Sequence, residues 1–204
     1  MNAKTMTPTT RERPILFSAP MIRCLFAGTK SQTRRVMKPQ PTAGKILPTP
    51  AGAPYRIGDT LWVREAWGPR NDTSIYYRAD EHLRHFAIDP PPELAVIWEN
   101  RQPPSTARQW IPSIHMPRWA ARIFLSVTDV RVQRVQDITW RDVRAEGVDC
   151  PEHDFGIGMC VGHCPAIINA FRMLWNKLNA ARGHSWESNP WVWAYTFERL
   201  KGTP

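Results

Sequence analysis

The sequence predicts an α+β fold, a small and mostly β barrel with two or three packed helices and long loop insertions. A strand at residues 191–197 alternates strictly and puts four aromatic side chains on one face; they are Trp191, Trp193, Tyr195 and Phe197. A longer strand at 121–135 changes the parity of its apolar positions near Asp129. A bulge or sharp bend there would reconcile its two halves, as a small barrel requires.

The chain begins with a polar stretch followed by a short helix. Residues 1–13 are predicted to be a disordered tail, and 14–200 a single domain. Ser18 can cap a helix that ends at Ala27, with Gly28 as its C-terminal stop. This helix leads directly into the segment that carries the main motif of the chain.

Four other segments carry strand or helix patterns. Residues 60–67 predict a strand, and 75–79 its hairpin partner. A capping box at Thr139 opens a short helix that stops at Gly147, and an apolar stripe predicts a longer helix over 165–178. Segments rich in proline or glycine are predicted to be insertions; they lie at about 36–56, 80–118 and 149–165.

Composition narrows the class of protein. The chain has 204 residues, 27 Lys and Arg against 18 Asp and Glu, and a net charge of +9. A basic balance of this size favours nucleic acid or nucleotide ligands. No stretch approaches the ~20 apolar residues of a membrane span, and the first 13 residues lack the apolar core of a signal peptide. We therefore expect a cytoplasmic protein whose cysteines are reduced or bind metal.

The segment 28–35, Gly-Thr-Lys-Ser-Gln-Thr-Arg-Arg, places a lysine three residues before a threonine. A partly desolvated Lys30 can take the proton of the Thr33 hydroxyl and make it a nucleophile. Arg34 and Arg35 stay charged, so they suit binding of an anion or a carbonyl oxygen. The alternative is a surface turn with solvated charges.

The order of these elements resembles the ASCH-domain family, a branch of the PUA-like β-barrel superfamily. The resemblance is carried by two motifs, by the 123–132 strand, by the short helix that ends near Glu146 and by the last strand. The motifs are Gly28-x-Lys30-x-x-Thr33-x-Arg35 and Gly58-Asp59-x-Leu61-x-Val63. The resemblance covers the core and leaves the three insertions outside.

The resemblance implies hydrolysis of the N4-acyl amide of acetylated cytidine, with release of cytidine and a carboxylate. It implies that Lys30 is the base, Thr33 the nucleophile and Glu146 their partner. Glu146 would orient the lysine or handle the proton on the exocyclic nitrogen. Arg35 would bind substrate. No cofactor is needed for this chemistry.

Other interpretations stay open. Lys30 and Glu146 could instead form an ion pair that joins loop to helix. The protein could be a PUA-like module that binds RNA or modified nucleic acid without chemistry, or a metal-independent ribonuclease. Because Lys30 and Thr33 come after a helix stop, we expect both to contribute little to stability.

Two further residues are predicted to contact the substrate. Glu65 and Arg64 occupy consecutive strand positions, so one of them faces inward. An inward Glu65 could be a pocket carboxylate, although a structural pairing with an arginine explains it equally well. His115 stands in a loop flanked by prolines and is predicted to line the pocket.

A loop near the C-terminal helix concentrates potential metal ligands. Short cysteine and histidine spacings can supply the four nitrogen or sulfur ligands of a structural zinc. The predicted set is Cys150, His153, Cys160 and Cys164, with His163 as the alternative to Cys164. The competing interpretation is a loop with reduced thiols. Such a zinc would support folding, because these residues lie outside the proposed catalytic set.

Overall fold

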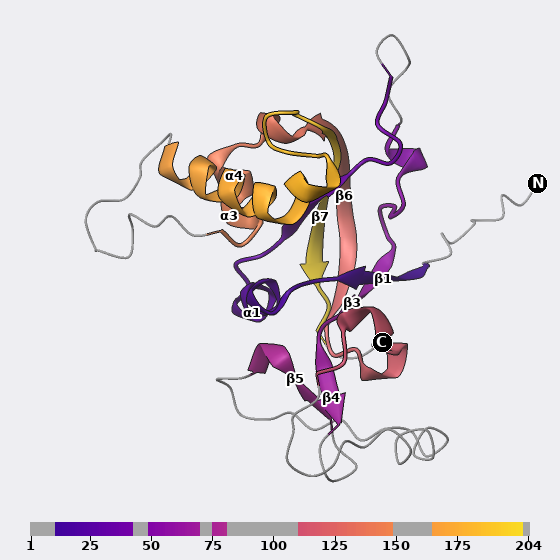
Figure 1. The fold of residues 1–204 in the computed structure, drawn as a ribbon. Helices are drawn as coiled ribbons and strands as arrows, with labels where there is room; N and C mark the ends of the chain where they lie inside the picture. The colour runs from indigo at the N-terminus through magenta and orange to yellow at the C-terminus, as the bar shows by residue number, and fades with distance from the viewer. Residues whose placement is uncertain (1–10, 43–48, 70–74, 81–109, 149–164, 202–204) are drawn as a thin grey trace, which may run out of the picture. The chain divides into compact units, whose positions relative to one another are not determined.

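The computed structural model describes residues 11–42, 49–69, 75–80, 110–148 and 165–201. Within them the chain is a mixed α+β protein, which confirms the predicted class (Figure 1). The helices are α1 (Ala19–Ala27), α3 (Trp140–Ala145) and α4 (Pro165–Asn179). The strands are β1 (Glu12–Leu16), β2 (Gln32–Val36), β3 (Thr60–Arg64), β4 (Trp67–Pro69), β5 (Ile75–Tyr77), β6 (Phe124–Arg134) and β7 (Trp191–Arg199).

Five strands form one mixed sheet in the order β1-β3-β6-β7-β2, and β4 pairs with β5 separately. β1 runs parallel to β3, with Glu12 opposite Thr60, whereas β2 runs antiparallel to β7. β1 and β2 are the edges of this sheet, and no pairing of the described strands closes it into the barrel that we expected. The sheet is therefore open over the described part of the chain.

Two boundaries differ from the sequence prediction. Glu12 and Arg13, assigned to the tail, pair with Thr60 and Leu61 as part of β1. An edge strand needs only one partner, so its polar and exposed side chains carry little strand signal. The predicted strand at 60–67 divides into β3 and β4, and it is β4 that forms the hairpin with β5.

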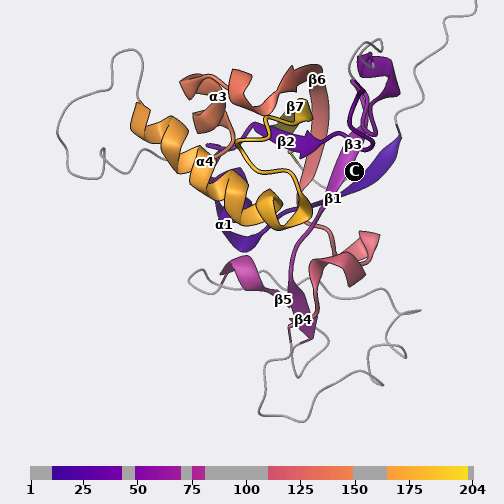
Figure 2. The same ribbon diagram turned by 45° about the horizontal axis from the view of Figure 1, so that its top comes forward.

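The chain divides into two compact units. The first contains residues 1–26, 60–125 and 199–204, and the second contains 27–59 and 126–198. The core of the first gathers aromatic and small side chains; these are Trp62, Trp67, Ile75, Tyr77, Met116, Ala120, Ala121 and Phe124. The core of the second joins the α3 and α4 faces to β7; its members are Val135, Ile138, Val143, Ile167, Phe171, Trp175 and Val192. α3 and α4 lie side by side in both ribbon views (Figure 2).

Local signals explain the confirmed elements. The Thr139 hydroxyl accepts a hydrogen bond from the Asp142 N–H, and the Asp142 carboxylate accepts one from the Thr139 N–H, which closes the capping box of α3. Gly28 after α1 and Gly147 after α3 have φ of 75° and 80°, where glycine is favoured. In β6, Val127 and Val130 are both buried although their parity differs, as predicted.

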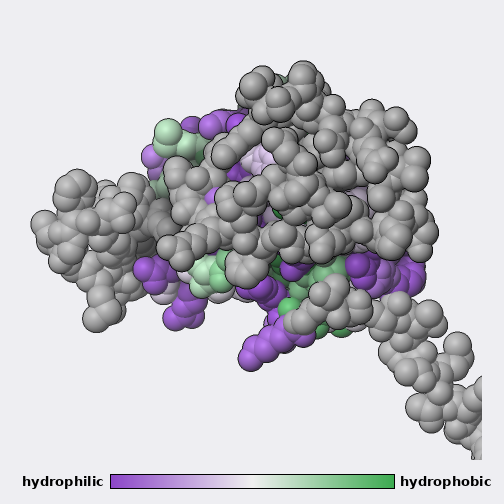
Figure 3. Space-filling view, turned by 90° about the horizontal axis from the view of Figure 1, so that it is seen from below, coloured by the Kyte–Doolittle hydropathy of each residue, from purple (hydrophilic) through white to green (hydrophobic). Residues whose placement is uncertain are grey.

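On the face drawn in Figure 3, hydrophobic residues (green) lie among hydrophilic ones (purple). The exposed examples are Leu16, Ile57, Ile114, Met173 and Leu178. Scattered residues of this kind are normal in folded proteins. Among the described residues, no helix has both the length and the apolar character needed to cross a membrane.

Candidate active site

The segment that carries the main motif is fixed by backbone bonds in the second unit. Lys30 forms an isolated antiparallel bridge with Glu146, the residue that caps the C-terminus of α3. The Ser31 N–H donates to the Ala145 carbonyl at 2.8 Å, and the Ser31 carbonyl accepts from Phe197 N–H at 2.9 Å. The start of β2 is therefore held between the end of α3 and β7.

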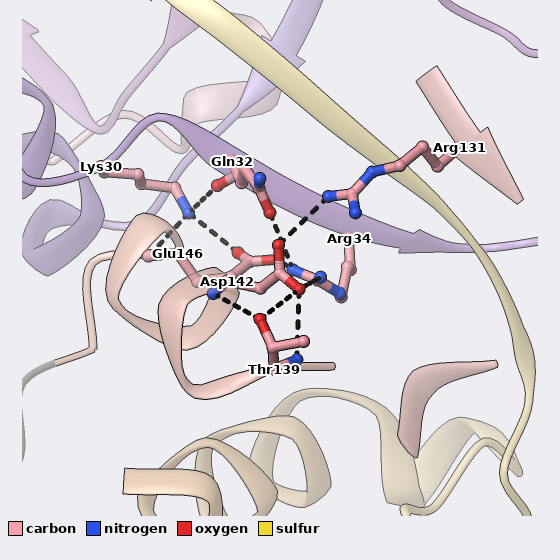
Figure 4. Close-up of polar contacts among 7 residues, drawn as sticks. All are labelled: Lys30, Gln32, Arg34, Arg131, Thr139, Asp142 and Glu146. Atoms are coloured by element: carbon pink, nitrogen blue, oxygen red, sulfur yellow. Dashed lines mark hydrogen bonds and ion pairs between the residues drawn. The ribbon is translucent and has the colours of Figure 1, made fainter. Parts of the chain in front are cut away.

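The Lys30 side chain is fully buried, and three acceptors of its Nζ are seen among the described residues (Figure 4). Its Nζ donates to the Gln32 carbonyl at 2.7 Å, to the Glu146 carbonyl at 2.8 Å and to Glu146 Oε2 at 3.0 Å. A neutral amine has two N–H donors, whereas an ammonium has three. Three acceptors within hydrogen-bond distance thus match a protonated Lys30. The sequence-predicted partners Lys30 and Glu146 are in direct contact.

Arg34 occupies the other side of the same carboxylate. Its NH1 donates to Glu146 Oε1 at 3.1 Å, and its NH2 lies 3.4 Å from Asp142 Oδ2. The Arg34 side chain is only 1% exposed. Glu146 therefore shares its two oxygens between Lys30 and Arg34, one oxygen for each.

Asp142 extends this cluster toward the surface. Its Oδ2 accepts from the Thr139 hydroxyl at 2.8 Å, and its Oδ1 accepts from Arg131 NH2 at 3.2 Å. Burial acts to raise the pKa of Asp142, but the Thr139 hydrogen bonds, the charge of Arg34 and the hydrogen bond from Arg131 outweigh it and lower that pKa to about 2. We call the alternating set Lys30, Glu146, Arg34, Asp142 and Arg131 the charge chain.

Thr33 and Arg35 lie on the opposite face of β2, because successive strand residues point to opposite faces. Thr33 is opposite Tyr195 in the β2–β7 ladder, and Arg35 is opposite Trp193. Burial lowers the pKa of Arg35, and the charges of Glu146, Tyr55 and Tyr195 act against this. Tyr55 and Tyr195 meet edge to face, with ring centroids 5.1 Å apart.

One expectation about this segment is wrong. Lys30 and Thr33 are not lightly packed loop residues, because they are only 4% and 2% exposed, respectively, and Thr33 belongs to β2. The helix stop at Gly28 was correctly predicted. The segment after Gly28 is buried because α3 and β7 hold it by backbone bonds.

Glu65 and His115 belong to the first unit. Glu65 is 1% exposed and accepts two hydrogen bonds from Arg122, which also pairs with Asp80. Burial raises the pKa of Glu65, and the hydrogen bonds and charge of Arg122 oppose the rise. The arginine pairing considered as the alternative for Glu65 is therefore present. His115 is exposed at the end of a 3₁₀ turn, Ser113–His115.

The predicted zinc ligands Cys150, His153, Cys160 and Cys164, and the alternative His163, lie outside the described residues. In the part of the chain that the structure covers, no group of three or more His, Cys, Asp or Glu side chains could hold a metal. The zinc site stays a prediction.

Sequence reasoning missed Asp142 and gave no separate role to Arg34. A signal for Asp142 was present, since residues 142 and 146 are four apart in a helix and share one face. Alternation along β2 also separates Arg34 from Arg35. The alternation does not tell which of the two arginines points toward Glu146.

No family model, curated protein or solved structure matches the chain. The resemblance to ASCH-domain proteins therefore depends on the motifs quoted above. The function has to be argued from the residues and geometry of the charge chain.

Proposed function

We propose that the protein is an amidohydrolase that releases the acyl group from N4-acylated cytosine nucleosides, with N4-acetylcytidine as the reference substrate. The observation that carries the proposal is the buried contact between Lys30 and Glu146, at 3.0 Å. These two positions are 116 residues apart in the sequence. They are the base and its partner in the ASCH-type motif.

The energetic character of this contact supports a functional role. Removing two charges from water costs several kcal/mol per ion, and well-packed apolar side chains often replace a buried ion pair without loss of stability. Buried, closely paired ionisable groups are therefore candidates for a functional site. The competing explanation is that the pair only anchors the start of β2 to α3.

We also propose the finer fold assignment, a PUA-like domain of the ASCH type. Its support is the order of elements: α1, the Lys30 segment, β2, β3, β6, α3 with Glu146 as its C-cap, and β7. The described residues form an open five-stranded mixed sheet, and the assignment to a PUA-like domain goes one step beyond this sheet.

The chemistry would proceed in two acyl-transfer steps. Lys30 first loses an ammonium proton to solvent, and Glu146 Oε2, its 3.0 Å neighbour, orients the neutral amine. Thr33 lies on the face of β2 opposite Arg34, so the scheme requires the start of β2 to turn the Thr33 hydroxyl toward Lys30. The neutral amine then takes the hydroxyl proton while Thr33 Oγ1 attacks the acyl carbon, and the C–N bond breaks as the proton passes to the exocyclic nitrogen. Water hydrolyses the acyl-threonine to carboxylate and regenerates Thr33.

Two features of the geometry bear on this scheme. The side chains of Lys30 and Glu146 are 0% and 5% exposed, so substrate must displace a neighbouring group before it contacts them. Arg35, on the Thr33 face of β2, is the proposed oxyanion partner, a contribution typically worth ~3 kcal/mol.

A specific observation favours a second function, the binding of RNA without chemistry. The net charge is +9, and arginines lie over partly exposed tryptophans. Arg134 is 4.3 Å from the ring centroid of Trp191, and Arg141 is 5.1 Å from that of Trp140. Cationic and aromatic side chains together suit single-stranded nucleic acid. A metal-independent ribonuclease is the third candidate.

The deciding experiment incubates the full chain with N4-acetylcytidine and measures cytidine and acetate by chromatography. Wild type should release both in equal amounts. Thr33→Ala should lower turnover by orders of magnitude, Thr33→Ser should retain part of it, and the exposed control Arg172→Gln should match wild type. Melting curves establish that each variant is folded.

The contrary outcomes separate the candidates. Wild-type turnover by folded Thr33→Ala would remove threonine as the nucleophile. Absence of hydrolysis by wild type, together with tight RNA binding that weakens steeply with salt, would establish the binding module instead. Cleavage of that RNA without added metal would favour the ribonuclease.

A further inference from the structure

We propose that Arg34 is a positioning residue for the Lys30–Glu146 pair, which it keeps poised for proton release by holding one Glu146 oxygen and opposing the positive charge of Lys30. The contacts of Arg34 stand by themselves, but the benefit to catalysis rests on the proposed role of Lys30 as a base. The sequence offered two adjacent arginines for substrate binding, and the structure separates their tasks.

The Glu146 carboxylate is divided between two cations. Oε2 lies 3.0 Å from Lys30 Nζ, and Oε1 lies 3.1 Å from Arg34 NH1. The other two described acceptors of the Lys30 ammonium are neutral carbonyls, those of Gln32 and Glu146. The carboxylate that stabilises the ammonium is therefore shared with a second cation.

The guanidinium of Arg34 is directed at two carboxylates. Its NH1 donates to Glu146 and its NH2 lies within ion-pair distance of Asp142, and the side chain is 1% exposed, so we assign its effect to these carboxylates and to its charge. Within the described structure, its Nε and NH2 have no hydrogen-bond acceptor, although NH2 lies within ion-pair distance of Asp142. A buried donor without an acceptor lowers the stability of the folded protein. A purely stabilising role therefore does not explain why Arg34 stands here.

The charged groups around Glu146 come from three elements. The segment leading into β2 provides Lys30 and the strand itself provides Arg34 and Arg35, α3 provides Asp142, and Arg131 of β6 reaches Asp142. Among the described residues, the phenols of Tyr55 and Tyr195 lie beside Arg35, and Asp129 pairs with Arg131. With all the buried groups ionised, Arg34 balances Asp142 and disfavours the protonated form of Lys30.

Arginine suits this task better than lysine or histidine. A guanidinium keeps its charge throughout the range in which enzymes work, so its repulsion of Lys30 does not change with pH. Without Arg34, both oxygens of Glu146 would be available to Lys30 and no second cation would hold the carboxylate. Lys30 would then lose its proton at a higher pH.

The test measures the proton on Lys30 directly. The chain has six lysines, and a fully buried ammonium exchanges its protons slowly, so ¹⁵N-detected NMR of lysine side chains can follow Lys30. Lys30→Met identifies its signal by loss. The pH midpoint of that signal is compared in wild type, Arg34→Gln, Arg34→Lys and the control Arg172→Gln, whose arginine pairs with Glu187 in solvent.

The proposal expects Arg34→Gln to raise the midpoint by about one pH unit. Arg34→Lys, which keeps the charge, should restore most of the wild-type value, and Arg172→Gln should not change it. The pH at which hydrolysis switches on should rise in parallel for Arg34→Gln. A folded Arg34→Gln with an unchanged or lower midpoint overturns the proposal.

Arg34→Gln could fail to fold, since it leaves two buried carboxylates with fewer partners. In that case Asp142→Asn is the deciding variant. It removes the carboxylate that competes with Glu146 for Arg34, so the pH midpoint of the Lys30 signal should fall. A rise in this midpoint overturns the proposal. The NMR result does not need turnover. If Arg34→Gln shifts the Lys30 midpoint but the wild type does not hydrolyse the substrate, the role of Arg34 is supported and the amidase is refuted. If the wild type hydrolyses the substrate but the midpoint does not shift, the amidase is supported and the role of Arg34 is refuted.

Discussion

Arg122 donates two parallel hydrogen bonds to Glu65, from Nε to Oε1 at 2.8 Å and from NH2 to Oε2 at 3.0 Å. The same guanidinium bonds Asp80 at 2.6 and 2.9 Å and lies 3.8 Å from the ring centroid of Tyr77. Burial acts to lower the pKa of Arg122, but its hydrogen bonds to Glu65 and Asp80 raise it above the usual range. One permanent cation thus compensates two buried carboxylates.

Arg122→Met should strongly destabilise the first unit. Removal of one partner of a buried ion pair typically costs about 3–5 kcal/mol, because the remaining charge is uncompensated. Urea denaturation measures the loss, and Arg172→Gln, an exposed pair, should change stability by less than about 1 kcal/mol. An Arg122→Met midpoint close to wild type would show that Glu65 and Asp80 do not depend on this cation.

Lys30→Met should also lower the free energy of unfolding by about 3 kcal/mol or more, since it removes one of the two cationic hydrogen-bond donors that the structure describes for the buried Glu146. A double-mutant cycle with Glu146→Gln checks the cause. If the pair interacts as described, the double variant should lose less than the sum of the two single losses. Additive losses would mean that the two side chains stabilise the protein independently.

Asp142 should contribute acid-dependent stability. Its folded pKa of about 2 is below the usual 3.8, so between these values the unfolded chain binds more protons than the folded one. The contribution, on the order of 1–2 kcal/mol, is complete above pH 4 and is lost as pH falls through 2. The stability difference between wild type and Asp142→Asn, measured by denaturation, should therefore shrink as pH falls from 4 to 2. A constant difference would contradict this assignment.

Thr139→Ala should lower the free energy of unfolding by about 1 kcal/mol, because it removes the side chain that caps α3. It should also raise the pKa of Asp142, whose lowering depends chiefly on hydrogen bonds from Thr139. Thr139→Ser keeps the hydroxyl and is the matched control. Carboxyl NMR titration follows Asp142, and an unchanged pKa in Thr139→Ala would assign the shift to the arginines instead.

The cysteine- and histidine-rich segment at 150–164 predicts about one structural zinc per chain. Protein purified without chelator should contain it, and chelation should lower the melting temperature while folded protein retains its turnover. Replacement of Cys150 and Cys160 by serine should abolish zinc content. A zinc content near zero with an unchanged melting temperature would favour the alternative, a segment with reduced thiols and no metal.

The sequence by itself determined the elements whose signals are local. Gly28 ends α1, Thr139 caps α3, and apolar periodicity marks α4 and β7, because caps and periodicities act over a few residues. β1 was missed because an edge strand with exposed side chains is stabilised by its partner β3, which is distant in the sequence.

The tertiary structure alone decided the charge chain. Lys30 was expected to be lightly packed, and its burial depends on the end of α3, which is brought against it from 116 residues away. Arg34 and Arg35 are chemically identical neighbours, and strand alternation only places them on opposite faces. α3 covers one of those faces, so Arg34 and not Arg35 hydrogen-bonds Glu146.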